Sequence, residues 1–231
     1  GRFLINEDTD AATSIISKSS KIIFRGSGST QGGTELFMKN TLPPADPAKM
    51  WTVPPIIILS SSGSDKLLSQ VANSAAVGSH SLTTTEGLKE GDWIVLNLLD
   101  NSKELIEAEL KQYKVEPTWT YLVNKGIDVK VYHQIKEINS KMVTLTAPIT
   151  YTIDAKYKWD VIKFANSEEV GIEDIAFVGN WKDNFVHHRS WKDDSGFTML
   201  RISRTTNSWM KNCRFTDCSV AAIVAQSANI S

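Results

Sequence analysis

The segment from Gly179 to Gly196 holds the densest group of chemically capable side chains in the 231-residue chain. It contains two adjacent histidines, two tryptophans, two lysines, an arginine and three aspartates: His187, His188, Trp181, Trp191, Lys182, Lys192, Arg189, Asp183, Asp193 and Asp194. A long loop of this composition on a rigid scaffold is a common way to build a site. We therefore expect the loop to carry catalytic and substrate-binding groups.

The paired histidines favour β-elimination of an acidic glycan. In that reaction a base removes the proton beside a uronate carboxylate, and cations stabilise the negative charge that develops. His187 or His188 with a neighbouring arginine has the right residue types. Adjacent side chains on an extended segment point to opposite sides. We therefore expect one imidazole to face the substrate and the other to pack below.

Aspartates in the same loop indicate a second reaction type, glycoside hydrolysis. Hydrolysis needs two carboxyl groups, about 5–5.5 Å apart for retention of configuration and about 6.5–9.5 Å apart for inversion. Asp193 and Asp194 are candidates, but adjacent residues diverge, so Asp183 or Asp217 would have to serve as the partner. The sequence does not decide between lyase and hydrolase chemistry.

A pair of cations is predicted on the strands beside the loop. Lys163 and Arg201 both alternate with apolar neighbours, so both are predicted to point outward from adjacent strands about 4.8 Å apart. Such a pair would bind a carboxylate or sulfate, for which the arginine fork is well suited. Arg204 lies nearby in the sequence. The alternative is that these cations pair with acidic residues of a loop such as 181–196.

Three tryptophans have rings that could stack on sugars. For Trp181 and Trp191 the sequence leaves open whether they bind substrate or pack against the protein. Trp209 follows Ser208 at an expected corner, so we expect a structural role for it.

The remaining elements are short strands separated by turns. Runs such as 21–25, 92–96, 129–132 and 142–145 are rich in β-branched and aromatic residues and are bounded by turn residues. Only 101–115 shows helical spacing. The formal net charge of −1 gives no electrostatic argument for nucleic acid or anionic membranes as partners. The chain contains no apolar run of the roughly 18 residues that span a membrane.

Internal repeats indicate how these strands are arranged. Residues 161–177 align with 199–215 at an offset of 38, and residues 200–207 align with 222–229 at an offset of 22. The matched positions are Ile172 with Met210, Ile175 with Cys213, Phe177 with Phe215, Leu200 with Ala222, Ile202 with Val224, Thr205 with Ser227, and Asn207 with Asn229. Repeats near 22 residues are typical of parallel β-solenoids. The longer offset predicts a loop of about 16 extra residues in one coil.

Several motifs resemble a known superfamily. Residues 1–5 (GRFLI), 20–28 (SKIIFRGSG), 32–34 (GGT) and 167–177 (SEEVGIEDIAF) are similar to coils of pectate-lyase-like right-handed parallel β-helix proteins. The resemblance implies a secreted or periplasmic polysaccharide lyase or glycoside hydrolase. It also leaves Ca²⁺ open as a ligand, although the usual aspartate cluster is not recognisable. We assign no residue to a metal site.

The predicted fold is therefore all-β: a right-handed parallel β-helix with an inserted small β module. We expect N-terminal β-helix coils over 1–71, the inserted module with one short helix over 72–150, and further coils over 151–231. Both ends look cut from a longer protein, so more coils are expected past Ser231. The expected function is degradation of an acidic polysaccharide by a lyase. The alternatives are a glycoside hydrolase and a noncatalytic glycan-binding β-helix protein.

Overall fold

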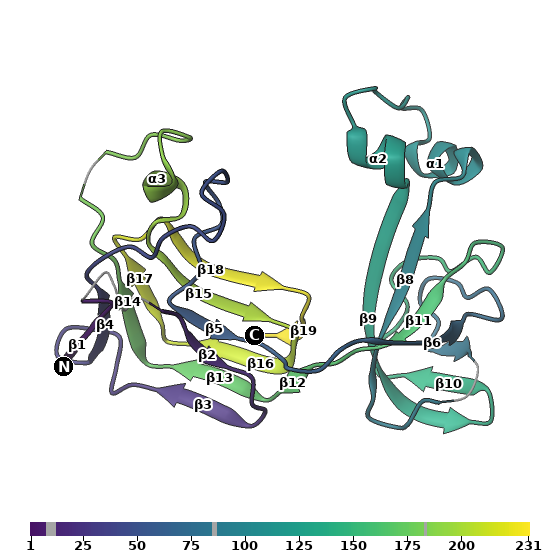
Figure 1. The fold of residues 1–231 in the computed structure, drawn as a ribbon. Helices are drawn as coiled ribbons and strands as arrows, with labels where there is room; N and C mark the ends of the chain where they lie inside the picture. Colours follow the sequence, from purple (N-terminus) through teal and green to yellow (C-terminus); the bar gives the residue numbers. More distant parts are fainter. Residues whose placement is uncertain (8–12, 85–86, 183) are drawn as a thin grey trace. The chain divides into compact units, whose positions relative to one another are not determined.

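The chain forms two compact units. The computed structural model describes residues 1–7, 13–84, 87–182 and 184–231 (Figure 1). The first unit comprises Gly1–Ser62 and Asn166–Ser231, and the second comprises Gly63–Ala165. In both units most of the regular secondary structure is β-strand. No helix in the described ranges is long and apolar enough to cross a membrane.

Three sheets with only parallel strand pairs build the first unit. The first contains β1 (Arg2–Ile5), β4 (Thr34–Met38), β14 (Ile175–Val178) and β17 (Arg214–Thr216). The second contains β3 (Ile22–Arg25), β13 (Val170–Glu173) and β16 (Thr205–Lys211), with β12 (Ser167–Glu168) and β19 (Ala228–Ile230) also pairing with β16. The third contains β2 (Ile15–Ser17), β5 (Ile57–Leu59), β15 (Thr198–Ser203) and β18 (Val220–Ala225). The chain visits the three sheets in rotation, and successive coils stack on one another, with β12 and β13 of one coil both pairing with β16 of the next.

The strand register follows the repeats found in the sequence. Phe177 pairs with Phe215 at the offset of 38, and Leu200 pairs with Ala222 at the offset of 22. The inward side chains of successive strands stack, and they form a buried core that includes Leu59, Ile172 and Ile202. The predicted register is confirmed for residues 172–177 and 200–207, but not for 161–164.

Residues with a left-handed backbone conformation recur at corresponding positions of successive coils. Lys21, Glu169, Asn207 and Asn229 precede or interrupt strands of the second sheet, and all have φ between 49° and 58°. Asn229 Nδ2 donates to Asn207 Oδ1 at 2.6 Å, so the predicted pairing of these asparagines is present. A non-glycine residue in this conformation costs roughly 1–2 kcal/mol, and asparagine tolerates it better than most. The side-chain bond between stacked corners offsets part of that cost.

An antiparallel six-stranded sheet forms the second unit. Its order is β6 (Lys66–Gln70), β11 (Asp160–Lys163), β8 (Trp93–Asp100), β9 (Ile127–Asn139), β10 (Met142–Leu145) and β7 (Ser81–Thr83). Two helices, α1 (Lys103–Leu110) and α2 (Thr120–Lys125), connect β8 to β9. Ile94, Leu96, Ile135 and Trp159 belong to its core, which is separate from the core of the first unit.

The unit boundaries differ from the expected 72–150 module. The second unit begins and ends farther out, at Gly63 and Ala165. The reason is that β6 and β11, which flank the expected module, hydrogen-bond to one another and β11 also pairs with β8. The helix expected over 101–115 is present only as α1, and α2 was not anticipated.

The predicted pairing of Lys163 with Arg201 is wrong. Lys163 lies on β11 in the second unit, where Val161 is buried and the strand pairs in antiparallel fashion. Its Nζ contacts both carboxylate oxygens of Asp92 at 2.8 and 2.9 Å. Residues 161–164 have the same alternation as 199–202, but alternation alone does not distinguish a parallel partner from an antiparallel one. Lys163 is thus held in an ion pair with Asp92.

Candidate functional site

The candidate site is the loop that joins β14 to β15, residues 179–196, which we call the α3 loop. It contains one short helix, α3 (Trp191–Ser195), and projects from the sheets of the first unit (Figure 1). Gly179 starts the loop in close contact with the Asp217 carbonyl, where a Cβ would clash. At the other end a Cβ on Gly196 would lie 2.6 Å from the Lys192 carbonyl oxygen. Glycine is therefore required where the loop leaves and rejoins the sheets.

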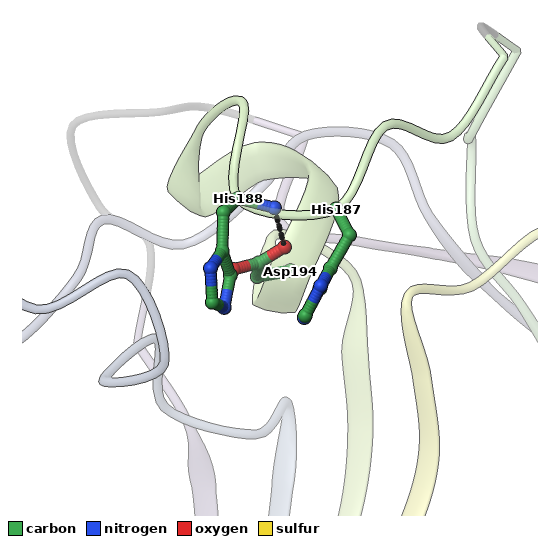
Figure 2. A group of neighbouring side chains, drawn as sticks. All are labelled: His187, His188 and Asp194. Atoms are coloured by element: carbon green, nitrogen blue, oxygen red, sulfur yellow. Dashed lines mark hydrogen bonds and ion pairs between the residues drawn. The ribbon is translucent and has the colours of Figure 1, made fainter.

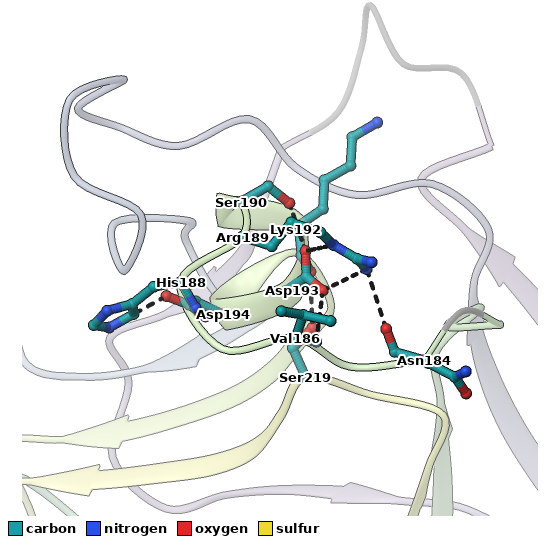
Figure 3. A network of polar contacts seen from close by, with 9 residues as sticks. All are labelled: Asn184, Val186, His188, Arg189, Ser190, Lys192, Asp193, Asp194 and Ser219. Carbon is teal, nitrogen blue, oxygen red and sulfur yellow. Dashed lines mark hydrogen bonds and ion pairs between the residues drawn. The ribbon is translucent and has the colours of Figure 1, made fainter.

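Asp193 organises the interior of the loop (Figure 3). Its side chain is only 1% exposed, and Arg189 binds both of its oxygens, at 2.6 and 3.1 Å. The Ser190 hydroxyl and the Val186 backbone N–H also donate to it, at 2.6 and 3.1 Å. These contacts, led by Arg189, lower the pKa of Asp193 to about 2. The carboxylate is thus ionised and fully engaged, which favours a positioning role over the predicted catalytic one.

Both histidines face the same side of the loop (Figure 2). Their ring centroids are 3.8 Å apart, with 33° between the ring planes. The expectation that they point apart is wrong because the segment is not extended: His188 has φ of 61° and lies in a turn. Asp194 completes the group, since its Oδ1 accepts the His188 backbone N–H at 2.9 Å. His188 Nε2 lies 3.8 Å from Asp194 Oδ2.

This group brings together three side chains of the types that bind metal ions. One ligand atom from each of His187, His188 and Asp194 lies within 4.8 Å of the other two. No residue was assigned to a metal site from the sequence, because the four histidines and two cysteines form no recognisable closed metal-binding motif and the usual aspartate cluster for Ca²⁺ is not recognisable. Ca²⁺, which prefers an all-oxygen shell, does not suit two imidazoles and one carboxylate.

The tryptophans of the loop pack inward. Trp181 and Trp191 are partly buried against the core of the first unit. The Trp181 ring meets Phe197 edge-on, with centroids 6.5 Å apart. Lys192 Nζ lies 5.7 Å from the centroid of the Trp191 ring. These contacts favour the structural alternative for both tryptophans.

Phe185 is the exposed aromatic ring that sequence reasoning missed. It is 58% exposed, and its ring centroid lies 6.2 Å from that of His187. The sequence does contain a signal for its exposure, because Phe185 is an apolar residue in a charged loop without strand or helix periodicity. Together Phe185 and His187 present two adjacent rings to solvent.

The remaining predicted residues lie on strands and corners. Arg201 is on β15, where its register partners on either side are Ile58 and Ile223, so it is flanked by aliphatic side chains. Arg204 occupies a left-handed corner with φ of 55°. Trp209 donates from Nε1 to Glu173 Oε1 at 2.7 Å, in agreement with its expected structural role.

The carboxylate pair needed for hydrolysis is not assembled by the residues that the structure describes in this loop. Asp193 is buried in its network, and Asp194 faces the histidines. Asp217 lies at a corner with φ of 50°, and its carbonyl accepts the Trp181 backbone N–H at 3.2 Å. Asp183 lies outside the described residues.

The second unit has a hollow of its own. A cavity of about 390 Å³ is lined by aromatic and charged side chains, among them Tyr151, Tyr157, Trp159, Glu109 and Lys156. The Tyr151 hydroxyl donates to Glu109, and burial raises the pKa of Tyr151. This cavity is a competing candidate for ligand binding.

Comparison with known proteins gives structural neighbours only. No protein-family model and no curated protein matches the chain. The tailspike Gp54 of Acinetobacter baumannii bacteriophage AP22, solved in complex with a capsular saccharide, matches with a TM-score of 0.55 and 11% identity. The match covers 100% of this chain and 30% of that one, so the chain spans about a third of its length. The tailspike gp61 of Pseudomonas phage phi297 has a TM-score of 0.48 at 12% identity, covering 93% and 37% of the two chains. The AP22 match shows a shared fold.

Proposed function

We propose that the first unit is a right-handed parallel β-helix of the pectate-lyase-like kind. The support is its connectivity: the chain visits three parallel sheets in rotation and stacks successive coils on one another. The tailspike neighbour with a TM-score of 0.55 supports the same architecture. In such a solenoid each coil contacts only its neighbours, so a long loop can be added without disturbing the stack.

We further propose that the chain belongs to a protein that recognises a bacterial surface polysaccharide, and that the α3 loop contributes to its glycan site. The observation that carries this proposal is a loop, held by the contacts of Asp193, that exposes two adjacent rings, Phe185 and His187. Flat rings stack on the apolar face of a sugar. Lys192 is also exposed and supplies a cation for an acidic glycan. The neighbouring tailspike, solved with a capsular saccharide, points to the same ligand class.

Cleavage by β-elimination is the second candidate, with His187 as the base. Its support is the exposed imidazole pair, which offers an accessible base in the same loop. The guanidinium of Arg189, however, is bound to Asp193 and points away from His188 (Figure 3). The cation that stabilises the developing negative charge would therefore come from Lys192, which is exposed in the same loop. A protein acting on such polymers works outside the cytoplasm, in a secreted or periplasmic location.

The test is a binding titration of the full chain against acidic and neutral polysaccharides. Phe185→Ala should weaken binding about tenfold, because loss of a ring contact worth about 1.4 kcal/mol has that effect. Tyr157→Ala, in the cavity of the second unit, is the matched control and should bind normally. Binding that survives Phe185→Ala but is lost in Tyr157→Ala would move the site to the second unit. Failure to bind any polymer would refute the proposal.

The same samples distinguish recognition from cleavage. Absorbance of unsaturated uronates in the wild type, lost in His187→Ala, would establish the lyase. New reducing ends without that absorbance would establish hydrolysis instead. Binding without either product would identify a noncatalytic glycan-binding protein.

A further inference from the structure

The His187, His188 and Asp194 group has nearly the dimensions of a metal site. Its three ligand atoms lie within 4.8 Å of one another, and His188 Nε2 is 3.8 Å from Asp194 Oδ2. In a tetrahedral zinc site with bonds of about 2.0–2.1 Å, the ligand atoms are about 3.4 Å apart. Small side-chain rotations of exposed imidazoles are enough to close that difference.

The backbone holds these donors in place without an ion. The left-handed conformation of His188 brings its ring to the same side as that of His187. The His188 N–H is bonded to Asp194 Oδ1, which leaves Oδ2 directed at the imidazole. On the other side of the turn, the Val186 N–H is bonded to Asp193. Hydrogen bonds that orient a ligating carboxylate in this way are typical of metal sites.

An ion pair alone does not account for the group. A contact between His188 and Asp194 uses only one imidazole. In the described part of the chain, the His187 ring contacts Phe185 and His188 but makes no hydrogen bond. A shared cation would give both imidazoles a ligand role and place the carboxylate opposite them.

We infer that His187, His188 and Asp194 bind a divalent transition-metal ion, with Zn²⁺ the ion that best suits the donors. Two imidazole nitrogens and one carboxylate oxygen match the ligand preference of Zn²⁺ and exclude Ca²⁺ and Mg²⁺. Three protein ligands leave at least one position for water or another oxygen ligand. Metal binding by this group is independent of glycan recognition through Phe185, but it is incompatible with His187 as the base of β-elimination, because a metal-bound imidazole has no free lone pair to accept a proton.

The test is a Zn²⁺ titration of the full chain after removal of metals with a chelator. A chromophoric chelator that competes for Zn²⁺ should report one ion bound per chain. Co²⁺ in place of Zn²⁺ should give visible absorption bands of a low-coordinate nitrogen and oxygen site. Ca²⁺ should not displace either ion. A wild-type chain that binds no Zn²⁺ overturns the inference.

Variants locate the ion. His187→Ala, His188→Ala and Asp194→Asn should each weaken Zn²⁺ binding at least about tenfold. Asp194→Asn keeps an oxygen that accepts the His188 N–H, so the turn is retained. His187→Gln is a second variant of that position that preserves side-chain bulk. His80→Ala in the second unit is the control and should bind as the wild type does. Loss of binding in His80→Ala, or wild-type binding in the three ligand variants, places the ion elsewhere.

Discussion

Phe177 and Phe215 stack face to face on the neighbouring strands β14 and β17, with ring centroids 4.8 Å apart and planes only 7° from parallel. They are separated by 38 residues in the chain because the α3 loop intervenes. The stack shows that the loop is added at a corner while the coils on either side remain in register. Phe177 is 1% exposed, so the pair also joins the loop-bearing coil to the next one.

Replacing Phe177 with alanine should destabilise the first unit by about 3–5 kcal/mol, the usual effect of truncating a buried phenylalanine. Phe215→Ala is the comparison, and it should have a smaller effect because Phe215 is only partly buried. Urea unfolding of the full chain, followed by circular dichroism, gives both values. Equal effects would contradict the difference in burial between the two rings, and no effect for Phe177→Ala would contradict its place in a buried stack.

Asp193→Asn should loosen the α3 loop. The substitution removes the charge that Arg189 binds and weakens the contacts of Ser190 and Val186. We expect limited trypsin digestion within the loop to become about tenfold faster, because local opening requires less free energy. Asp217→Asn, at a corner of the stack, should leave the digestion rate unchanged. An unchanged rate for Asp193→Asn would show that the loop is held by its tryptophans instead.

Gly171→Ala should disturb the Trp209 indole, since an added Cβ would lie 2.5 Å from that ring. The ring is fixed by its bond to Glu173, whose pKa is lowered by Trp209 and by Arg25. We expect a loss of about 1–3 kcal/mol in stability, the range for overpacked sites. The double variant Gly171→Ala with Trp209→Leu should lose less than the sum of the single variants. Additive losses in thermal unfolding would refute the contact.

Stability of the second unit should fall as the pH drops below about 6.5. His133 is 2% exposed, and burial lowers its pKa below the usual value, with a smaller contribution from His80. Below the unfolded pKa the unfolded chain binds a proton that the folded unit does not, so acid favours unfolding until the folded pKa is passed. His133→Leu should flatten this pH dependence. Thermal unfolding at several pH values checks it, and an unchanged slope in the variant would assign the effect to another group.

Sequence reasoning succeeded where inward side chains stack. Leu200 over Ala222 and Asn207 over Asn229 were predictable because a solenoid repeats its buried and corner positions at a constant offset. It failed for residues 161–164, which alternate in the same way but pair with antiparallel strands. Register within one sheet can be deduced from apolar periodicity, whereas the choice of partner strand depends on contacts distant in the chain.

The sequence indicated which loop carries the candidate side chains, but it did not indicate how these side chains are arranged. The excess of about 16 residues in the longer repeat correctly predicted a long loop between strands at 179–196. The roles within it depended on a single backbone torsion, the positive φ of His188, which no alternation rule anticipates for histidine. Asp194 meets the histidines because its Oδ1 accepts the His188 N–H, whereas Asp193 is held by Arg189 and Ser190.

The left-handed corners at Lys21, Glu169, Asn207 and Asn229 have an evolutionary consequence. Each corner fixes the path of its coil by local backbone geometry and by contacts with adjacent coils. Coils that are distant in the stack make no contact, so a substitution in one has little effect on the other. Residues between corners can then diverge almost independently, and whole segments such as 63–165 can be acquired without refolding the stack. A scaffold of this kind keeps its shape while its outward-facing residues change. It can therefore remain superimposable on a tailspike when only 11% of the residues are identical.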